Sequence, residues 1–136
     1  MVAYPVVVYK DEDSDYGTVV PDLPGCVSAG PSLSIAMEMT HEAVQCHLEG
    51  MAKDGDPFPA PSELDDVVED EEYAHAKAFA AVEIDLDRLS AESERINITL
   101  PKWLISAIDS AEPNRSRFLA KCAIEGLQHA NKRKAG

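Results

Sequence analysis

Long apolar runs are missing from this sequence. No stretch approaches the roughly 20 consecutive apolar residues that a membrane-spanning helix requires, so we expect no membrane partner. The first residues, 1–5, lack the basic region and the apolar segment of a secretory signal. These two absences predict a cytoplasmic protein.

Cysteine is scarce as well. The three cysteines, Cys26, Cys46 and Cys122, lie far apart and form no C-x-x-C pair. This spacing argues against a disulfide framework and against a cysteine-based metal site. We expect reduced, mostly buried thiols.

Catalytic and metal-binding motifs are also lacking. Nothing resembles a nucleophile elbow or a phosphate-binding glycine loop. Residues 11–17 have acids at every second position, but Tyr16 stands where an EF-hand needs glycine, and predicted strands flank the run. His41 and His47 are six residues apart, whereas metal ligands on a helix are usually three or four apart. We therefore expect no catalytic residue, no metal ion and no cofactor.

Charge is present in abundance, but it is divided unevenly. The 136 residues carry a net charge of −13. Residues 1–93 hold four Lys and Arg against 21 Asp and Glu, a net charge of −17. Residues 94–136 hold eight Lys and Arg against four acids, a net charge of +4. An acidic body joined to a basic module suggests two partners of opposite charge.

The N-terminal 90 residues have the pattern of a small α+β domain. Runs of β-branched and aromatic residues predict strands, and apolar residues three and four apart predict an amphipathic helix. Ser32 is a good N-cap for that helix, and Gly55 and Pro57 end it. The expected order is strands over 4–9, 16–20 and 26–29, a helix over 32–53, and a last strand over 79–85.

Residues 54–75 interrupt this pattern. Pro57, Pro59 and Pro61 stiffen the chain, and seven acids follow between residues 63 and 72. We expect an acidic, solvated linker or irregular flap, and a specific binding tail is the alternative.

The C-terminal module, residues 94–136, opens with a strictly alternating strand. Its apolar face carries Ile96, Ile98 and Leu100, and its polar face carries Arg95, Asn97 and Thr99.

Two helices are expected to follow this strand. Pro101 can start the first, which has Leu104, Ile105 and Ile108 on its core side, and Asn114 can cap the second. The apolar stripe of the second helix is Phe118, Leu119, Cys122, Ala123 and Leu127. About 40 residues give too small a core for a stable monomer, so we expect dimerisation. Trp103 is expected at the dimer edge or against the N-terminal domain.

Two stretches resemble a known family. The run Pro-Asp-Leu-Pro-Gly-Cys at 21–26, Ala29-Gly30 and the helix with Leu33, Ala36 and Glu42-Ala43 resemble the N-terminal domain of HicB antitoxins. The runs 95–101 and 114–119 resemble a ribbon-helix-helix DNA-binding domain, which some HicB proteins carry at the C-terminus.

The resemblance implies a β-β-β-α-β domain over 1–90 that neutralises HicA, a small mRNA-cleaving toxin with a catalytic histidine. It also implies a β-α-α ribbon-helix-helix domain over 94–136 that forms a homodimer and binds operator DNA, so that the antitoxin autoregulates its operon. The antitoxin itself would not be an enzyme.

A ribbon-helix-helix dimer lays its two antiparallel strands in the major groove. Only the polar face can then reach bases, so Arg95, Asn97 and Thr99 are the expected base contacts; Arg pairs with guanine and Asn with adenine. The free amides at the start of the second helix suit a phosphate. The expected phosphate contacts are Asn114, Arg115, Ser116 and Arg117.

One alternative remains from the residues alone. Residues 1–90 could form a sensor for a metal or a small ligand, attached to a ribbon-helix-helix transcriptional repressor. Such a sensor would need a His/Cys cluster or a pronounced apolar pocket.

Overall fold

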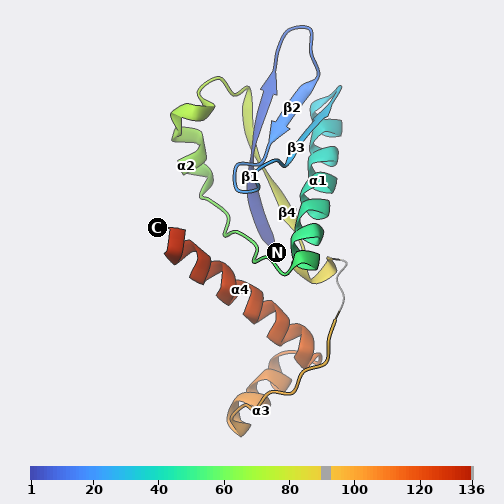
Figure 1. Cartoon of the computed structure of the whole chain (residues 1–136), viewed down its shortest axis with the longest axis vertical. Helices are drawn as coiled ribbons and strands as arrows, with labels where there is room; N and C mark the ends of the chain where they lie inside the picture. Colours follow the sequence, from blue (N-terminus) through green and yellow to red (C-terminus); the bar gives the residue numbers. More distant parts are fainter. Residues whose placement is uncertain (90–92, 136) are drawn as a thin grey trace.

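The N-terminal half folds around a four-stranded antiparallel sheet (Figure 1). A computed structural model describes residues 1–89 and 93–135. The strands are β1 (Val2–Lys10), β2 (Tyr16–Val19), β3 (Val27–Gly30) and β4 (Ala78–Ile84), in the order β3-β2-β1-β4. β1 is therefore central and pairs with both β2 and β4. The four strands predicted for this half are confirmed, with ends that differ by one or two residues.

Helix α1 (Leu33–Asp54) covers one face of the sheet. It begins where predicted, because the Ser32 Oγ accepts a hydrogen bond of 3.2 Å from the Ile35 N–H. It ends at Gly55, whose φ of 75° lies in the left-handed region that favours glycine. Every fourth residue from Ala36 to Leu48 is buried, and this stripe forms the face that packs on the strands.

The core lies between α1 and alternate residues of the strands. Thr18 of β2 and Thr40 of α1 meet there with their hydroxyl oxygens 2.6 Å apart. Because the Thr40 hydroxyl donates to the Ala36 carbonyl at 2.6 Å, the Thr18 hydroxyl donates to Thr40 and both buried groups are satisfied. The buried apolar members of this core are Val2, Tyr4, Val6, Val8, Val20, Leu23, Cys26, Val44, Leu48, Val82 and Ile84.

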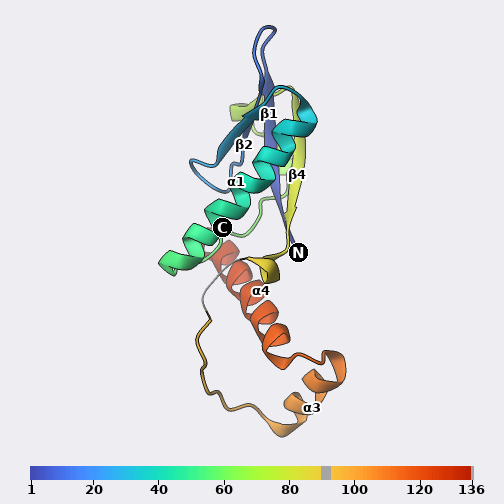
Figure 2. The same ribbon diagram turned by 90° about the vertical axis from the view of Figure 1, so that its right-hand side faces the viewer.

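The opposite side of the sheet is covered by the segment that follows α1 (Figures 1 and 2). It contains α2 (Leu64–Glu69) and a 3-10 turn, η1 (Glu71–Tyr73). Val67 of α2 is buried, and so is Val7 on the side of β1 that faces away from α1. The segment is thus more ordered than the solvated linker expected from its composition.

Three side-chain hydrogen bonds hold the proline segment, residues 56–63, in place. The Asp22 carboxylate accepts from the Ser62 N–H at 2.9 Å and from the Ser62 hydroxyl at 2.6 Å. The Tyr4 hydroxyl donates to the Pro59 carbonyl at 2.7 Å. The turn at 21–26 therefore has a structural role, because its Asp22 fastens a chain segment 40 residues away in the sequence.

The C-terminal third consists of α3 (Lys102–Ala111) and α4 (Arg115–Ala135), which follow a short turn, η2 (Leu86–Arg88). Both predicted helices are confirmed. Residues 93–100 adopt no regular secondary structure, so the predicted strand over 94–100 is not formed in the single chain. A strand needs a partner for its backbone N–H and C=O groups, and none of the described strands pairs with this stretch. The expected domain boundary at 90 lies outside the described residues.

The expected burial of the thiols is wrong for two of the three cysteines. Cys26 is buried, and burial raises the pKa of its thiol. Cys46 and Cys122 are exposed. Cys46 lies two residues after the buried Val44, which turns it about 200° around the helix and away from the sheet.

Gly30 allows β3 to lie directly against the first turn of α1. A Cβ atom at this position would lie 2.6 Å from the backbone nitrogen of Ala36 and 2.9 Å from its Cα. Gly30→Ala is therefore expected to lower the free energy of unfolding by about 1–3 kcal/mol, the usual cost of overpacking. Chemical denaturation measures this change. The matched control is Gly17→Ala, because a Cβ at Gly17 meets nothing within 4 Å. Equal stabilities of the two variants would contradict the close approach.

Candidate functional site

The first candidate surface is the stretch before α3. The predicted base-contacting side chains, Arg95, Asn97 and Thr99, are all exposed. Ile96 and Ile98 are exposed as well, to 72% and 58%. Both faces of the predicted strand are therefore open to solvent. Full burial of one isoleucine side chain would stabilise the protein by about 1.5–3 kcal/mol, and this stabilisation is not realised in the single chain. Two uncovered isoleucines on alternate positions make this stretch a candidate interaction surface.

The uncovered apolar surface extends over the two helices. Trp103 is 72% exposed and Leu127 is 56% exposed, so Trp103 does not pack against the N-terminal domain. Ile108 is the only buried apolar residue that the structure describes beyond residue 93. Among the members of the predicted stripe on α4, Phe118 and Leu119 are half-buried and Cys122, Ala123 and Leu127 are exposed. The C-terminal third therefore has almost no core of its own.

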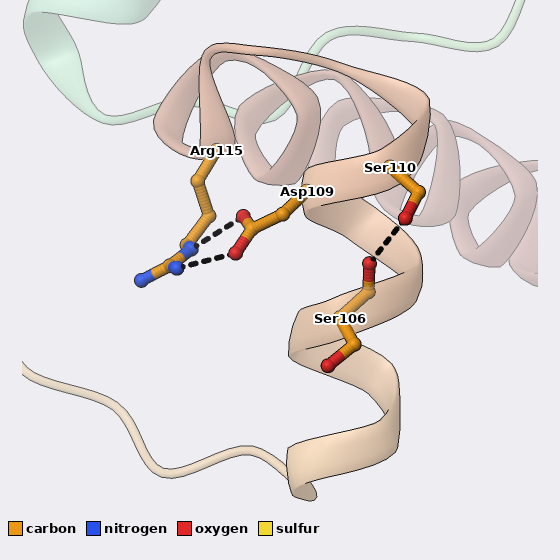
Figure 3. Close-up of polar contacts among 4 residues, drawn as sticks. All are labelled: Ser106, Asp109, Ser110 and Arg115. Atoms are coloured by element: carbon orange, nitrogen blue, oxygen red, sulfur yellow. Dashed lines mark hydrogen bonds and ion pairs between the residues drawn. The ribbon is translucent and has the colours of Figure 1, made fainter.

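An ion pair closes the turn between α3 and α4 (Figure 3). The Arg115 Nε and Nη2 donate to the two carboxylate oxygens of Asp109 at 3.1 and 2.8 Å. Hydrogen bonds from Arg115 lower the pKa of Asp109. Both side chains remain about half exposed, and an exposed pair of this kind contributes little to stability. Its main effect is to hold the guanidinium in one orientation at the start of α4.

The four predicted phosphate-binding residues do not share one surface. Asn114 caps α4, because its Oδ1 accepts a hydrogen bond of 3.0 Å from the Arg117 N–H. Arg115 and Ser116 are exposed at the same helix end. Arg117 is turned about 200° from Arg115 and lines a hollow beside Leu86 of η2.

The acidic residues of the N-terminal half form a second candidate surface. The loop 11–15, between β1 and β2, and the acids of residues 63–72, in and around α2 and η1, are all exposed. Figure 1 places this loop at one end of the sheet and α2 at its side. Among the described residues, no group of three or more His, Cys, Asp or Glu could hold a metal ion. No helix within the described ranges is long and apolar enough to cross a membrane.

Comparison with known proteins identifies the family. The model of a family described as the HicB-like antitoxins of bacterial toxin–antitoxin systems matches residues 4–123. The chain belongs to this family. The resemblance of the sequence to HicB antitoxins is therefore confirmed, and the protein is an antitoxin and not an enzyme. Its α+β fold is also that of solved HicB structures.

The similarity to individual relatives extends over nearly the whole chain. An uncharacterised 14.9 kDa protein of Haemophilus phage HP1 is 38% identical over 93% of this chain and 98% of its own length. The crystal structure of the Burkholderia pseudomallei antitoxin HicB is 36% identical, with a TM-score of 0.74 over 93% of this chain and 99% of that one. Its N-terminal domain, solved alone, matches with a TM-score of 0.57 over 62% of this chain.

A further match comes from an assembly. A chain in the HicA3–HicB3 toxin–antitoxin complex is 26% identical, with a TM-score of 0.52 over 62% of this chain and 99% of that chain.

Sequence reasoning missed the contacts that join distant segments. The Asp109–Arg115 pair spans a helix break at Pro113, so no helical spacing rule points to it. The bond between Asp22 and Ser62 joins two loops, for which periodicity gives no signal. The only hint was the concentration of turn-forming residues at 21–25.

Proposed function

We propose that this HicB-like antitoxin neutralises a HicA-type, mRNA-cleaving toxin with residues 1–89. With residues 94–136 it forms a homodimer of the ribbon-helix-helix type and binds operator DNA, which makes it the repressor of its own operon. The observation that carries the second half of this proposal is the exposure of Ile96 and Ile98 in a module that lacks a core.

The toxin-binding role of the N-terminal half is supported by its relatives and by its charge. HicB3 forms a complex with the toxin HicA3. The net charge of −17 over residues 1–93, with exposed acids in the loop 11–15 and around α2, suits a basic partner. The electrostatic field of such a surface speeds the association of oppositely charged proteins, and added salt screens this effect.

The proposed dimer rests on residues 95–100, with which none of the described strands pairs. If this stretch pairs antiparallel with the same stretch of a second copy, its backbone groups gain partners. Ile96, Ile98 and Leu100 then face the helices, together with the open stripe of α4. Burial of this apolar surface offsets the cost of ordering the two strands.

Pairing also determines which side chains face DNA. Arg95, Asn97 and Thr99 alternate with the apolar residues and lie on the outer face of the two-stranded ribbon. Such a ribbon fits the major groove, where Arg reads guanine and Asn reads adenine. Arg115 and Ser116, which are exposed at the start of α4, are the proposed phosphate contacts.

The N-terminal domain alone is expected to neutralise the toxin. A fragment of residues 1–89 contains the whole sheet, α1 and their core, and it should fold and bind a HicA-type toxin while losing DNA binding. Co-expression growth assays and calorimetry measure this. The association rate should also fall as salt rises. A folded fragment that fails to bind the toxin, while the full chain binds it, would show that the roles are wrongly assigned.

Replacing Ile98 by Asp is expected to abolish the dimer. The substitution places a charge in the proposed shared core at a cost of several kcal/mol. Sedimentation should then give monomers in which residues 1–89 remain folded. Thr99→Asp is the matched control, since it adds the same charge on the outer face and should leave the dimer intact. A dimeric Ile98→Asp variant would place the main interface elsewhere.

Base and phosphate contacts are expected to respond differently to substitution. Asn97→Ala should weaken operator binding by about 1–3 kcal/mol per lost bidentate contact, with discrimination at the contacted base relaxed. Arg115→Ala should weaken binding to the operator and to a scrambled duplex equally. It should also reduce the salt dependence of the binding constant by about one phosphate contact per subunit. Titrations of both duplexes at two salt concentrations measure this.

Asp109→Asn is a control for Arg115→Ala that should change DNA affinity in the opposite direction. It removes a negative charge beside the guanidinium and should strengthen binding to both duplexes. If Asn97→Ala bound the operator like the unmodified protein, residues 95–99 would not be the reading surface.

A further inference from the structure

The second half of α4 extends beyond α3. α4 has 21 residues and α3 has 10, which corresponds to lengths of about 30 and 15 Å. α3 can therefore cover only part of α4. Figures 1 and 2 show that the remaining part passes beneath the end of the sheet where the N-terminus lies.

One face of α4 contacts the N-terminal domain there. Arg117, Lys121, Ile124 and Gln128 are spaced by four, three and four residues, so they lie on one side of the helix. With Glu125, they line a hollow whose other wall is Met1, Asp85 and Leu86. Ile124 is half-buried, whereas the neighbouring Ala123 and Glu125 are exposed.

Gln128 is half-buried at this contact. Its amide nitrogen is buried, although the helix around it is largely exposed. Burial raises the pKa of the Tyr4 hydroxyl, and an interaction with the Gln128 side chain lowers it. Tyr4 is the central-strand residue that also holds the proline segment. The contact therefore involves Met1, Asp85 and Leu86 of the N-terminal domain, and Gln128 also influences the Tyr4 hydroxyl of the central strand.

Opposite charges face each other across the same hollow. Asp85 belongs to the acidic half of the chain, and Arg117 and Lys121 belong to the basic half. Three members of the apolar stripe, Leu119, Cys122 and Ala123, lie on the other side of α4, and Cys122 and Ala123 are exposed. The two faces are about 180° apart, so both can be occupied at once.

We infer that α4 has two binding faces, one for a second copy and one that docks the C-terminal module onto the N-terminal domain of the same chain. The first face rests on the dimer proposed above, and the docking face does not. The full-length chain is then a single rigid body.

Nuclear relaxation of the full chain tests the docking. Amides of the sheet and of α4 should report one rotational correlation time in the unmodified protein. Ile124→Asp should separate the two values, with that of the N-terminal domain falling toward the value of a free domain. The dimer should persist in sedimentation. The matched control is Ile35→Asp, an exposed isoleucine on α1, which should keep one correlation time.

Ala123→Asp tests the opposite face. It should give monomers that still tumble as one body. If instead Ala123→Asp remained dimeric, the proposed dimer face would be wrong and the docking would be unaffected. Gln128→Ala, a milder change at the docking face, should shift the Tyr4 resonances and increase independent motion even if Ile124→Asp loses helicity.

Three results would overturn the docking. The first is separate correlation times in the unmodified protein. The second is a single correlation time that persists in both docking-face variants. The third is a monomeric Ile124→Asp variant, because Ile124 would then belong to the interface between copies.

Discussion

The close packing of α1 against β2 and β3 is the contact on which the rest of the N-terminal half depends. It requires a residue without a side chain at Gly30, because the first turn of α1 lies directly over that backbone. It also requires the matched hydroxyls of Thr18 and Thr40, since either one alone would be a buried polar group without a full set of partners. With α1 in this position, the even-numbered residues of β1 form one core and Val7 is left for the segment that returns on the other side.

The elements governed by local chemistry were predictable from the sequence. The alternation in β1, the Ser32 cap and the glycine stop at Gly55 each act over a few residues and need no tertiary context. The family motif at 21–26 could also be recognised, but its mechanical role could not, because Asp22 acts on Ser62. The stretch at 94–100 has the pattern of a strand, yet pattern specifies only which faces are apolar. A strand also needs a pairing partner, and none of the described strands supplies one for this stretch.

The uneven charge distribution has a structural counterpart. The acidic half completes its core within one chain, and its acids are left at the surface, at the hairpin tip and around α2. The basic half keeps most of its apolar residues uncovered. This difference suits the proposed division of roles between a preformed toxin-binding domain and a module that dimerises as concentration rises.

The hydrogen bonds that hold the proline segment also determine where local unfolding begins. Three side-chain hydrogen bonds to Asp22 and Tyr4 hold residues 59–62, and the partners of these bonds are 40 and 55 residues apart in the sequence. These bonds are few and lie outside the regular secondary structure, so local unfolding should begin there and not in the sheet. The first site accessible to a protease in the N-terminal domain is accordingly this loop, and its release would free the hydroxyl of Tyr4 from the Pro59 carbonyl.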